Sequence, residues 1–241
     1  MGDVKQIALV LIGSALLVVG LLFIINWDRP TPELLLSEDG SPIEMDGPLA
    51  PEALEESLED KAKMAIVNDM NPVAVFTTNM GVFEIELFAD QMPITTGNFI
   101  TLAEDGYYDG IKFHRIIDGF MIQGGDPNTK TENTASYGTG GPGYTIQDEF
   151  VVGENLSNVR GTISMANTGQ PNSGGSQFFI NTVDNLALDF DKQPLTSKHP
   201  VFGKIVNGMD VVDAISSVET GPRDLPVEPV VIESVVIRSE G

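Results

Sequence analysis

Cysteine is absent from this chain of 241 residues, and histidine occurs only twice. The lack of cysteine excludes disulfide bonds, thiolate nucleophiles and thiolate metal ligands. His114 and His199 stand far apart in the sequence, outside the usual spacing of metal ligands, so a zinc site would need mainly carboxylates. We therefore expect the chain to use neither a metal ion nor a cofactor.

Basic residues are also scarce, with 13 Lys and Arg against 35 Asp and Glu, which gives a formal net charge of −22 at pH 7. A surface this acidic repels phosphate backbones, so we expect no nucleic-acid partner. The excess of carboxylates suits solubility in a salty environment. Attraction of basic substrates is the alternative interpretation.

One long apolar run stands near the start, where residues 7–25 read IALVLIGSALLVVGLLFII without a charge. A helix of this length spans about 29 Å, which matches the hydrocarbon core of a bilayer. Trp27, the single tryptophan, follows where an interfacial aromatic residue is typical. A cleaved signal peptide is the alternative, but residues 26–30 lack its small-residue cleavage site.

We therefore expect residues 1–27 to form a transmembrane anchor and the chain to be a single-pass protein of the cell membrane. Lys5 precedes the apolar run, and the flank after it soon turns acidic. Because positive charges favour the cytoplasmic side, the remainder of the chain is expected outside the cytoplasm.

Residues 28–72 alternate prolines with acidic clusters and contain few apolar residues, which is typical of a tether. Within it, residues 51–67 predict a short helix, since Pro51 suits a first turn and the following glutamates favour the positive end of a helix dipole. This helix is either a solvated spacer or a site that binds a partner.

From residue 73 onwards the sequence pattern is typical of short strands separated by turns. Residues 73–78 and 82–88 flank Asn79-Met80-Gly81, a hairpin signal. Further strands are expected at 112–117, 120–123, 160–166, 176–182, 199–206 and 230–238. Helices are expected at 93–105, between Pro93 and Gly106, and at 209–216. Many short strands with two helices predict that residues 73–241 form a mainly β domain, a closed antiparallel barrel.

Three segments of this domain carry residues suited to chemistry. Residues 113–126 read FHRIIDGFMIQGGD, which predicts two strands around an Asp-Gly turn. Residues 161–169 read GTISMANTG and lead through a Gly-rich stretch into SQFFIN at 176–181. Residues 195–204 read LTSKHPVFGK.

In order and spacing, these segments resemble the signature of the cyclophilin family, and the resemblance covers residues 73–238. It implies an eight-stranded antiparallel barrel capped by two helices, and a peptidyl-prolyl cis-trans isomerase that needs no cofactor. The partners it implies are proline-containing segments of other proteins, and we expect the catalytic domain to be monomeric.

The resemblance also implies roles for individual residues. Arg115 matches the catalytic arginine, with His114 beside it and Gln123 to orient it. The residues that match the proline pocket and the substrate-binding edge are Phe120, Met121, Ala166, Asn167, Gln177, Phe179, Leu195 and His199. Pro194 stands where many relatives carry a tryptophan before the pocket leucine, so we expect weak binding of cyclosporin-type macrocycles.

Rotation about an X-Pro peptide bond is slow because it breaks amide resonance, at a barrier of about 18–20 kcal/mol. An enzyme can lower this barrier with an apolar slot for the ring and a donor to the nitrogen lone pair that appears in the twisted state. A guanidinium serves as that donor and favours the transition state over the planar ground state. The alternative function is a chaperone or assembly module that binds proline segments with little turnover, in which Arg115 would make a surface ion pair.

Overall fold

The computed structural model describes residues 71–153, 155–195 and 197–238. The expected anchor at 1–27, nearly all of the tether and its 51–67 helix lie outside these residues. Within the described ranges, no helix is both long enough and apolar enough to cross a membrane.

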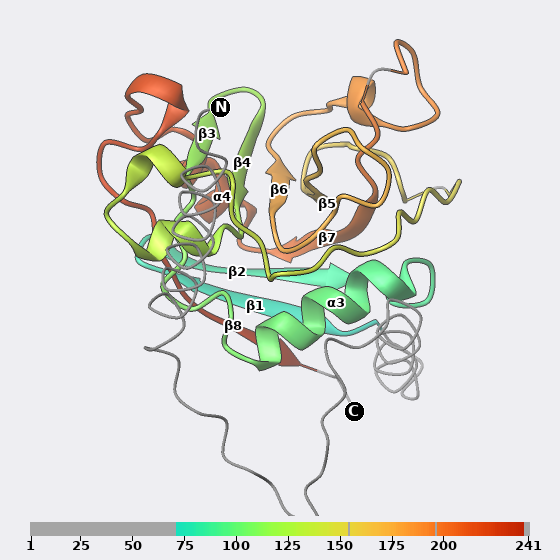
Figure 1. The fold of residues 1–241 in the computed structure, drawn as a ribbon, viewed down its shortest axis with the longest axis horizontal. Helices are drawn as coiled ribbons and strands as arrows, with labels where there is room; N and C mark the ends of the chain where they lie inside the picture. The colour runs from blue at the N-terminus through green and yellow to red at the C-terminus, as the bar shows by residue number, and fades with distance from the viewer. Residues whose placement is uncertain (1–70, 154, 196, 239–241) are drawn as a thin grey trace, which may run out of the picture. The chain divides into compact units, whose positions relative to one another are not determined.

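Eight strands and two α-helices make up the described part (Figure 1). The strands are β1 (Val73–Thr78), β2 (Gly81–Leu87), β3 (Arg115–Ile117), β4 (Met121–Gly124), β5 (Thr162–Met165), β6 (Phe178–Asn181), β7 (Val201–Asn207) and β8 (Ile232–Arg238). The helices are α3 (Pro93–Glu104) and α4 (Met209–Ser216), and short 3-10 turns include η2 (Thr134–Ser136), η3 (Leu186–Leu188) and η4 (Pro222–Asp224). The sequence-based prediction of eight strands and two helices is thus confirmed.

The strands form one antiparallel sheet in the order β3-β4-β6-β5-β7-β2-β1-β8, which curves into a half-barrel. Its two end strands approach each other through the segments that precede them, because Phe113 N donates to Val230 O at 2.9 Å and Lys112 bridges Val231. These contacts do not make β3 and β8 a paired ladder, so the complete closure expected from the sequence stays a prediction.

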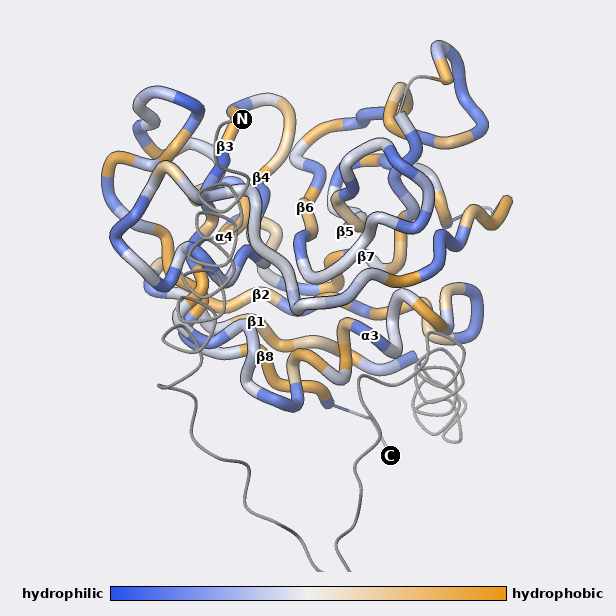
Figure 2. The backbone as a smooth tube through the Cα atoms, viewed as in Figure 1, coloured by the Kyte–Doolittle hydropathy of each residue, from blue (hydrophilic) through white to orange (hydrophobic). Residues whose placement is uncertain are grey.

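Alternation along the strands decides which side chains face the interior. In β2, Phe83, Ile85 and Leu87 are buried, whereas Glu84 and Glu86 between them are half-buried. Successive side chains of a strand point to opposite faces, so this pattern gives one apolar face and one polar face. Figure 2 shows the same alternation of apolar and polar residues along the tube.

Aromatic rings fill the interior. Phe76 of β1 stacks on Phe83 of β2 with centroids 4.7 Å apart, and it meets the edge of Phe178 of β6 at 5.8 Å. Helix α3 inserts Phe99 into the same group, 6.0 Å from the Phe178 ring. The carboxylate of Glu149 accepts bonds from the first N–H groups of α3, which fixes the helix start against the loop that follows residue 144. The strands that carry the candidate site are therefore held on a rigid core.

Candidate active site

The β3–β4 hairpin brings the first candidate residues together. Arg115 on β3 pairs in register with Gln123 on β4, so their side chains lie on the same face of the sheet. Gly119 takes φ = 67° in the connecting turn, a conformation that glycine adopts without steric cost. The corner after it is fixed because Phe120 O accepts bonds from Thr182 N at 3.1 Å and Asn185 Nδ2 at 2.8 Å.

These residues open onto a cavity of about 170 Å³. It is lined by Arg115, Phe120, Met121, Gln123, Ala166, Asn167, Phe179, Leu188 and His199. Met121 and Phe179 are buried and form an apolar floor, since β4 and β6 are neighbours in the sheet. The cavity therefore combines an apolar slot with one cationic side chain at its rim.

His199 forms one wall of the cavity. Its ring meets the Phe179 ring edge-on at 5.3 Å, and its Nδ1 lies 3.1 Å from Met165 O. A carbonyl oxygen can only accept, so Nδ1 carries the hydrogen in this contact. Burial lowers the pKa of the His199 imidazole, and the bond to Met165 opposes that shift. The ring is therefore a neutral wall at neutral pH.

The expectation for Leu195 needs correction. Leu188, which the family resemblance did not single out, lines the cavity, while Leu195 is 47% exposed and lines a different hollow. The physical reason is that the chain leaves the wall after Leu188 and is back at the wall at His199, whose N donates to Leu188 O at 3.1 Å. The family resemblance implied Leu195, but this backbone contact places Leu188 beside His199. The residue before the wall leucine is then Ala187, and the expectation attached to Pro194 loses its basis.

A buried carboxylate fixes the point where residues 189–198 leave the wall. Asp189 is 2% exposed and accepts bonds from Asn158 N at 2.7 Å and Asn158 Nδ2 at 2.8 Å. The same Nδ2 group donates to His199 O at 3.1 Å, so Asn158 holds both ends of the excursion. The sequence offers one signal for this role, the Leu188-Asp189 pair that follows a few residues after the strand at 176–182.

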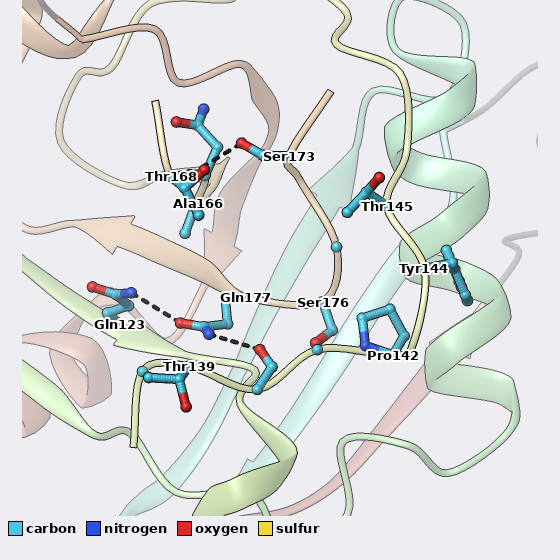
Figure 3. Close-up of a pocket in the computed structure, with 15 residues that line it drawn as sticks. Gln123, Thr139, Pro142, Tyr144, Thr145, Ala166, Thr168, Ser173, Ser176 and Gln177 are labelled. Atoms are coloured by element: carbon cyan, nitrogen blue, oxygen red, sulfur yellow. Dashed lines mark hydrogen bonds between the residues drawn. The ribbon is translucent and has the colours of Figure 1, made fainter. Parts of the chain in front are cut away.

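The two glutamines of the site form a chain of amides (Figure 3). Gln123 Nε2 donates to Gln177 Oε1 at 3.2 Å, and Gln177 Nε2 donates to Gly140 O at 2.8 Å. Both line a larger cavity of about 480 Å³, which shares Ala166 and Asn167 with the proposed slot. Gln177 is thus placed beside the slot rather than in its wall.

Arg115 has a partner that the sequence did not predict. Its Nε lies 3.4 Å from Asp224 Oδ2, and the two side chains are 41% and 46% exposed. Across residues 71–238, leaving aside 154 and 196, no hydrogen bond joins the side chains of Arg115 and Gln123. The expected orienting role of Gln123 therefore stays a prediction, while Asp224 is the group in contact.

His114 lies behind the arginine, outside the wall of the slot. It is 6% exposed and lines a hollow of about 360 Å³ that it shares with Arg115 and Asp224. Burial lowers the pKa of the His114 imidazole to about 4; the Asp126 carboxylate opposes this shift and the Arg115 guanidinium adds to it. Its Nδ1 has no hydrogen-bond partner among the residues placed by the structure. His114 is therefore a neutral neighbour of the arginine. Over the same described part, no group of three or more His, Asp or Glu side chains could hold a metal ion.

Comparison with known proteins agrees with this geometry. The family model of the cyclophilin type peptidyl-prolyl cis-trans isomerases matches residues 73–237. A peptidyl-prolyl cis-trans isomerase of Arabidopsis thaliana is 42% identical over 164 residues, which cover 67% of this chain and 93% of that relative. A Streptococcus pyogenes relative, described as joining a phosphatase and an isomerase, is 40% identical over 81% of this chain, which spans only 45% of the relative.

Solved structures that resemble this fold include cyclophilin type isomerases. The crystal structure of a cyclophilin type isomerase of Cryptosporidium parvum has a TM-score of 0.58 and 32% identity, covering 70% of this chain and 98% of that one. A second crystal structure of the same protein, determined in the presence of the dipeptide Ala-Pro, gives the same TM-score and identity.

Proposed function

Because the chain belongs to the cyclophilin-type peptidyl-prolyl cis-trans isomerase family and is such an isomerase, we propose that it assists the folding of extracytoplasmic proteins. The proposal places the catalytic domain outside the cytoplasm, monomeric and held in the cell membrane through residues 7–25. Its support is the uncharged run of nineteen residues and the acidic, proline-containing segment that follows.

A single juxtaposition carries the catalytic part of the proposal: Arg115 stands at the rim of a slot floored by Met121 and Phe179. The ring of a substrate proline enters the apolar slot, and the X-Pro amide then lies at the rim. As the amide twists, its nitrogen loses resonance and gains a lone pair. The guanidinium donates to this lone pair and lowers the energy of the twisted state more than that of the planar state.

The walls contribute without exchanging protons. Phe120, Met121 and Phe179 exclude water, which strengthens the bond that Arg115 donates. Ala166 and Asn167 form the edge along which the residue before the proline can hydrogen-bond. His199 is neutral and keeps its Nδ1 hydrogen on Met165 O, so it shapes the slot and does not act as an acid.

The test uses the full chain purified in detergent and a short peptide with one central proline. Exchange NMR spectroscopy reports the affinity of the peptide and the rate of cis-trans interconversion in one experiment. We expect catalysed interconversion at substoichiometric protein. Binding without acceleration would instead establish the proline-binding chaperone.

A further inference from the structure

A second hollow, of about 330 Å³, adjoins the proline slot. It is lined by Asp148, Phe150, Asn167, Gly169, Gln170, Pro171, Leu195, Ser197 and Lys198. Asn167 belongs to the lining of both the hollow and the slot. An extended peptide advances about 3.3 Å per residue, so a chain whose proline fills the slot reaches this groove within a few residues.

The groove is fixed by hydrogen bonds between its walls. Asp148 N donates to Asn172 Oδ1 at 3.0 Å, and Asn172 N returns a bond to Asp148 Oδ2 at 2.8 Å. Opposite them, Asn167 Nδ2 donates to Lys198 O at 2.6 Å. Three segments distant in sequence are thereby held around one space that exists before any ligand enters it.

The walls of the groove present apolar surface to solvent. Leu195 is 47% exposed although its backbone has φ = 62°, a left-handed conformation that is costly for a branched residue. Phe150 is held in place because its ring stacks on Phe190 with centroids 5.3 Å apart. One Asp and one Lys also line the groove, so it favours neither sign of charge.

We propose that this groove binds a large apolar side chain of the same substrate chain, a few residues from the proline. The inference rests on the proposed function and narrows the substrate class to proline segments that carry Leu, Ile, Met or Phe nearby. A flanking residue contributes equally to ground-state and transition-state binding, so its effect belongs in KM rather than kcat.

The test scans one leucine through the four positions on each side of the proline in an otherwise Gly-Ser peptide. With the full chain, we expect kcat/KM to rise about three- to tenfold at one position, through KM, because part of a leucine side chain leaves water. The variant Leu195→Ser should remove this gain and leave the rate on the unsubstituted peptide unchanged. Leu186→Ser is the matched control, since Leu186 is also 47% exposed and lines neither the groove nor the slot.

The outcomes separate the two levels of the proposal. A gain that survives Leu195→Ser, or no gain at any position while the plain peptide is isomerised, overturns the groove and leaves the isomerase intact. Absence of catalysis on every peptide would instead contradict the proposed function itself.

A separate observation concerns the loop that supplies Asp224. Arg223 and Asp224 have φ values of 65° and 59°, so two consecutive residues other than glycine are left-handed. Such a backbone persists only where its surroundings hold it. Here Arg223 Nη2 donates to Thr134 O at 2.6 Å, and Gly221 N donates to Leu225 O at 2.8 Å. The carboxylate is therefore presented to Arg115 from a fixed position.

The geometry points to Asp224 as a positioning residue for Arg115. The contact is made at Nε, and a guanidinium carries its five N–H groups in a planar fork. Occupying Nε restrains the plane of the fork while the terminal N–H groups stay available to the substrate amide.

The variant Asp224→Gly removes the side chain and keeps a backbone that glycine adopts freely. We expect kcat to fall about five- to twentyfold with KM within about twofold, because orientation of the donor counts only in the twisted state. Asp224→Asn should recover part of the rate, since the amide oxygen keeps a polar atom near Nε without the negative charge of the carboxylate. Asp213→Asn is the control for charge: Asp213 pairs with Arg160 at 2.7 Å at similar exposure.

A double-mutant cycle supplies a readout that a merely structural role would not move. In an Arg115→Ala background, Asp224→Gly should cause no further loss of kcat. An equal loss in both backgrounds, a loss confined to KM, or an unchanged rate would each overturn the assignment.

Discussion

At the scale of single residues, we expect substitutions of Arg115 to have a large effect on kcat. Arg115→Ala should lower kcat by about 10²–10³, by analogy with removal of one preorganised donor from an oxyanion hole. KM should change little, since a planar amide nitrogen is a poor acceptor. Arg115→Lys should recover little, because an ammonium lacks the planar fork. Exchange NMR spectroscopy of a proline peptide measures both quantities, and an alanine variant as fast as the parent would make Arg115 structural.

The two histidines lead to a prediction about the pH dependence of activity. The pKa values of His114 and His199 are both lowered, mainly by burial. The rings are then largely neutral above their ordinary pKa of about 6.5, and no step transfers a proton. We expect kcat/KM to vary less than about twofold between pH 6.5 and 9. A bell-shaped profile with a midpoint in this range would assign a titrating group to the reaction.

The free energy of unfolding should depend on pH below 6.5, where the activity prediction does not apply. His114 has a pKa of about 4 in the folded chain against 6.5 when unfolded. Below pH 6.5 the unfolded state therefore binds a proton that the folded state does not, and stability is lost as the pH falls. Between pH 6.5 and 5 the loss due to His114 should be about 1–2 kcal/mol. Urea unfolding at both pH values measures it, with His114→Asn as the comparison; equal losses in parent and variant would contradict it.

At the scale of elements, one glycine lets two segments approach. Gly125, just after β4, has φ = 86°, and an added Cβ would stand 2.2 Å from Ser176 O. Gly119 has φ = 67° with nothing within 4 Å of that Cβ position. Gly119→Ala should then cost about 1 kcal/mol of unfolding free energy, from the left-handed backbone alone. Gly125→Ala should cost at least about 2 kcal/mol more.

Thermal or urea unfolding of the two alanine variants measures this difference. Similar losses of stability in both would show that the backbone conformation, and not the close approach at Ser176, sets the cost at Gly125.

The helices and strands could largely be predicted from the sequence, whereas the places of some site residues could not. Strand positions followed from apolar alternation, as in β2, and the ends of α3 followed from Pro93 and Gly106. The residues of the β3–β4 hairpin were predictable because they are close in sequence. Leu188 and Asp224 were not, since their places depend on where long connections return to the sheet. Only a backbone contact such as His199 N to Leu188 O decides between two leucines seven positions apart.

At the scale of the whole molecule, the proposed orientation can be tested directly. Protease added to intact cells or spheroplasts should digest the domain that begins at residue 73. The reason is that Lys5, which precedes the apolar run, favours the cytoplasmic side for this end of the expected anchor. A cytoplasmic marker protein should survive the same treatment. Protection of the domain until the membrane is broken would reverse the proposed orientation.

The excursion between Leu188 and His199 starts and ends at one hydrogen bond, and Asn158 clamps both of its ends. The entropy of closing a loop grows only slowly with its length, by about 0.6 kcal/mol per doubling. The part of this excursion that precedes Lys198, whose carbonyl oxygen holds the slot residue Asn167, can therefore change in length or be exchanged without moving the catalytic slot. Rotation chemistry and client choice would then be free to diverge independently, because exchange of this loop alters one wall of the groove and leaves Arg115 and the floor of the slot in place.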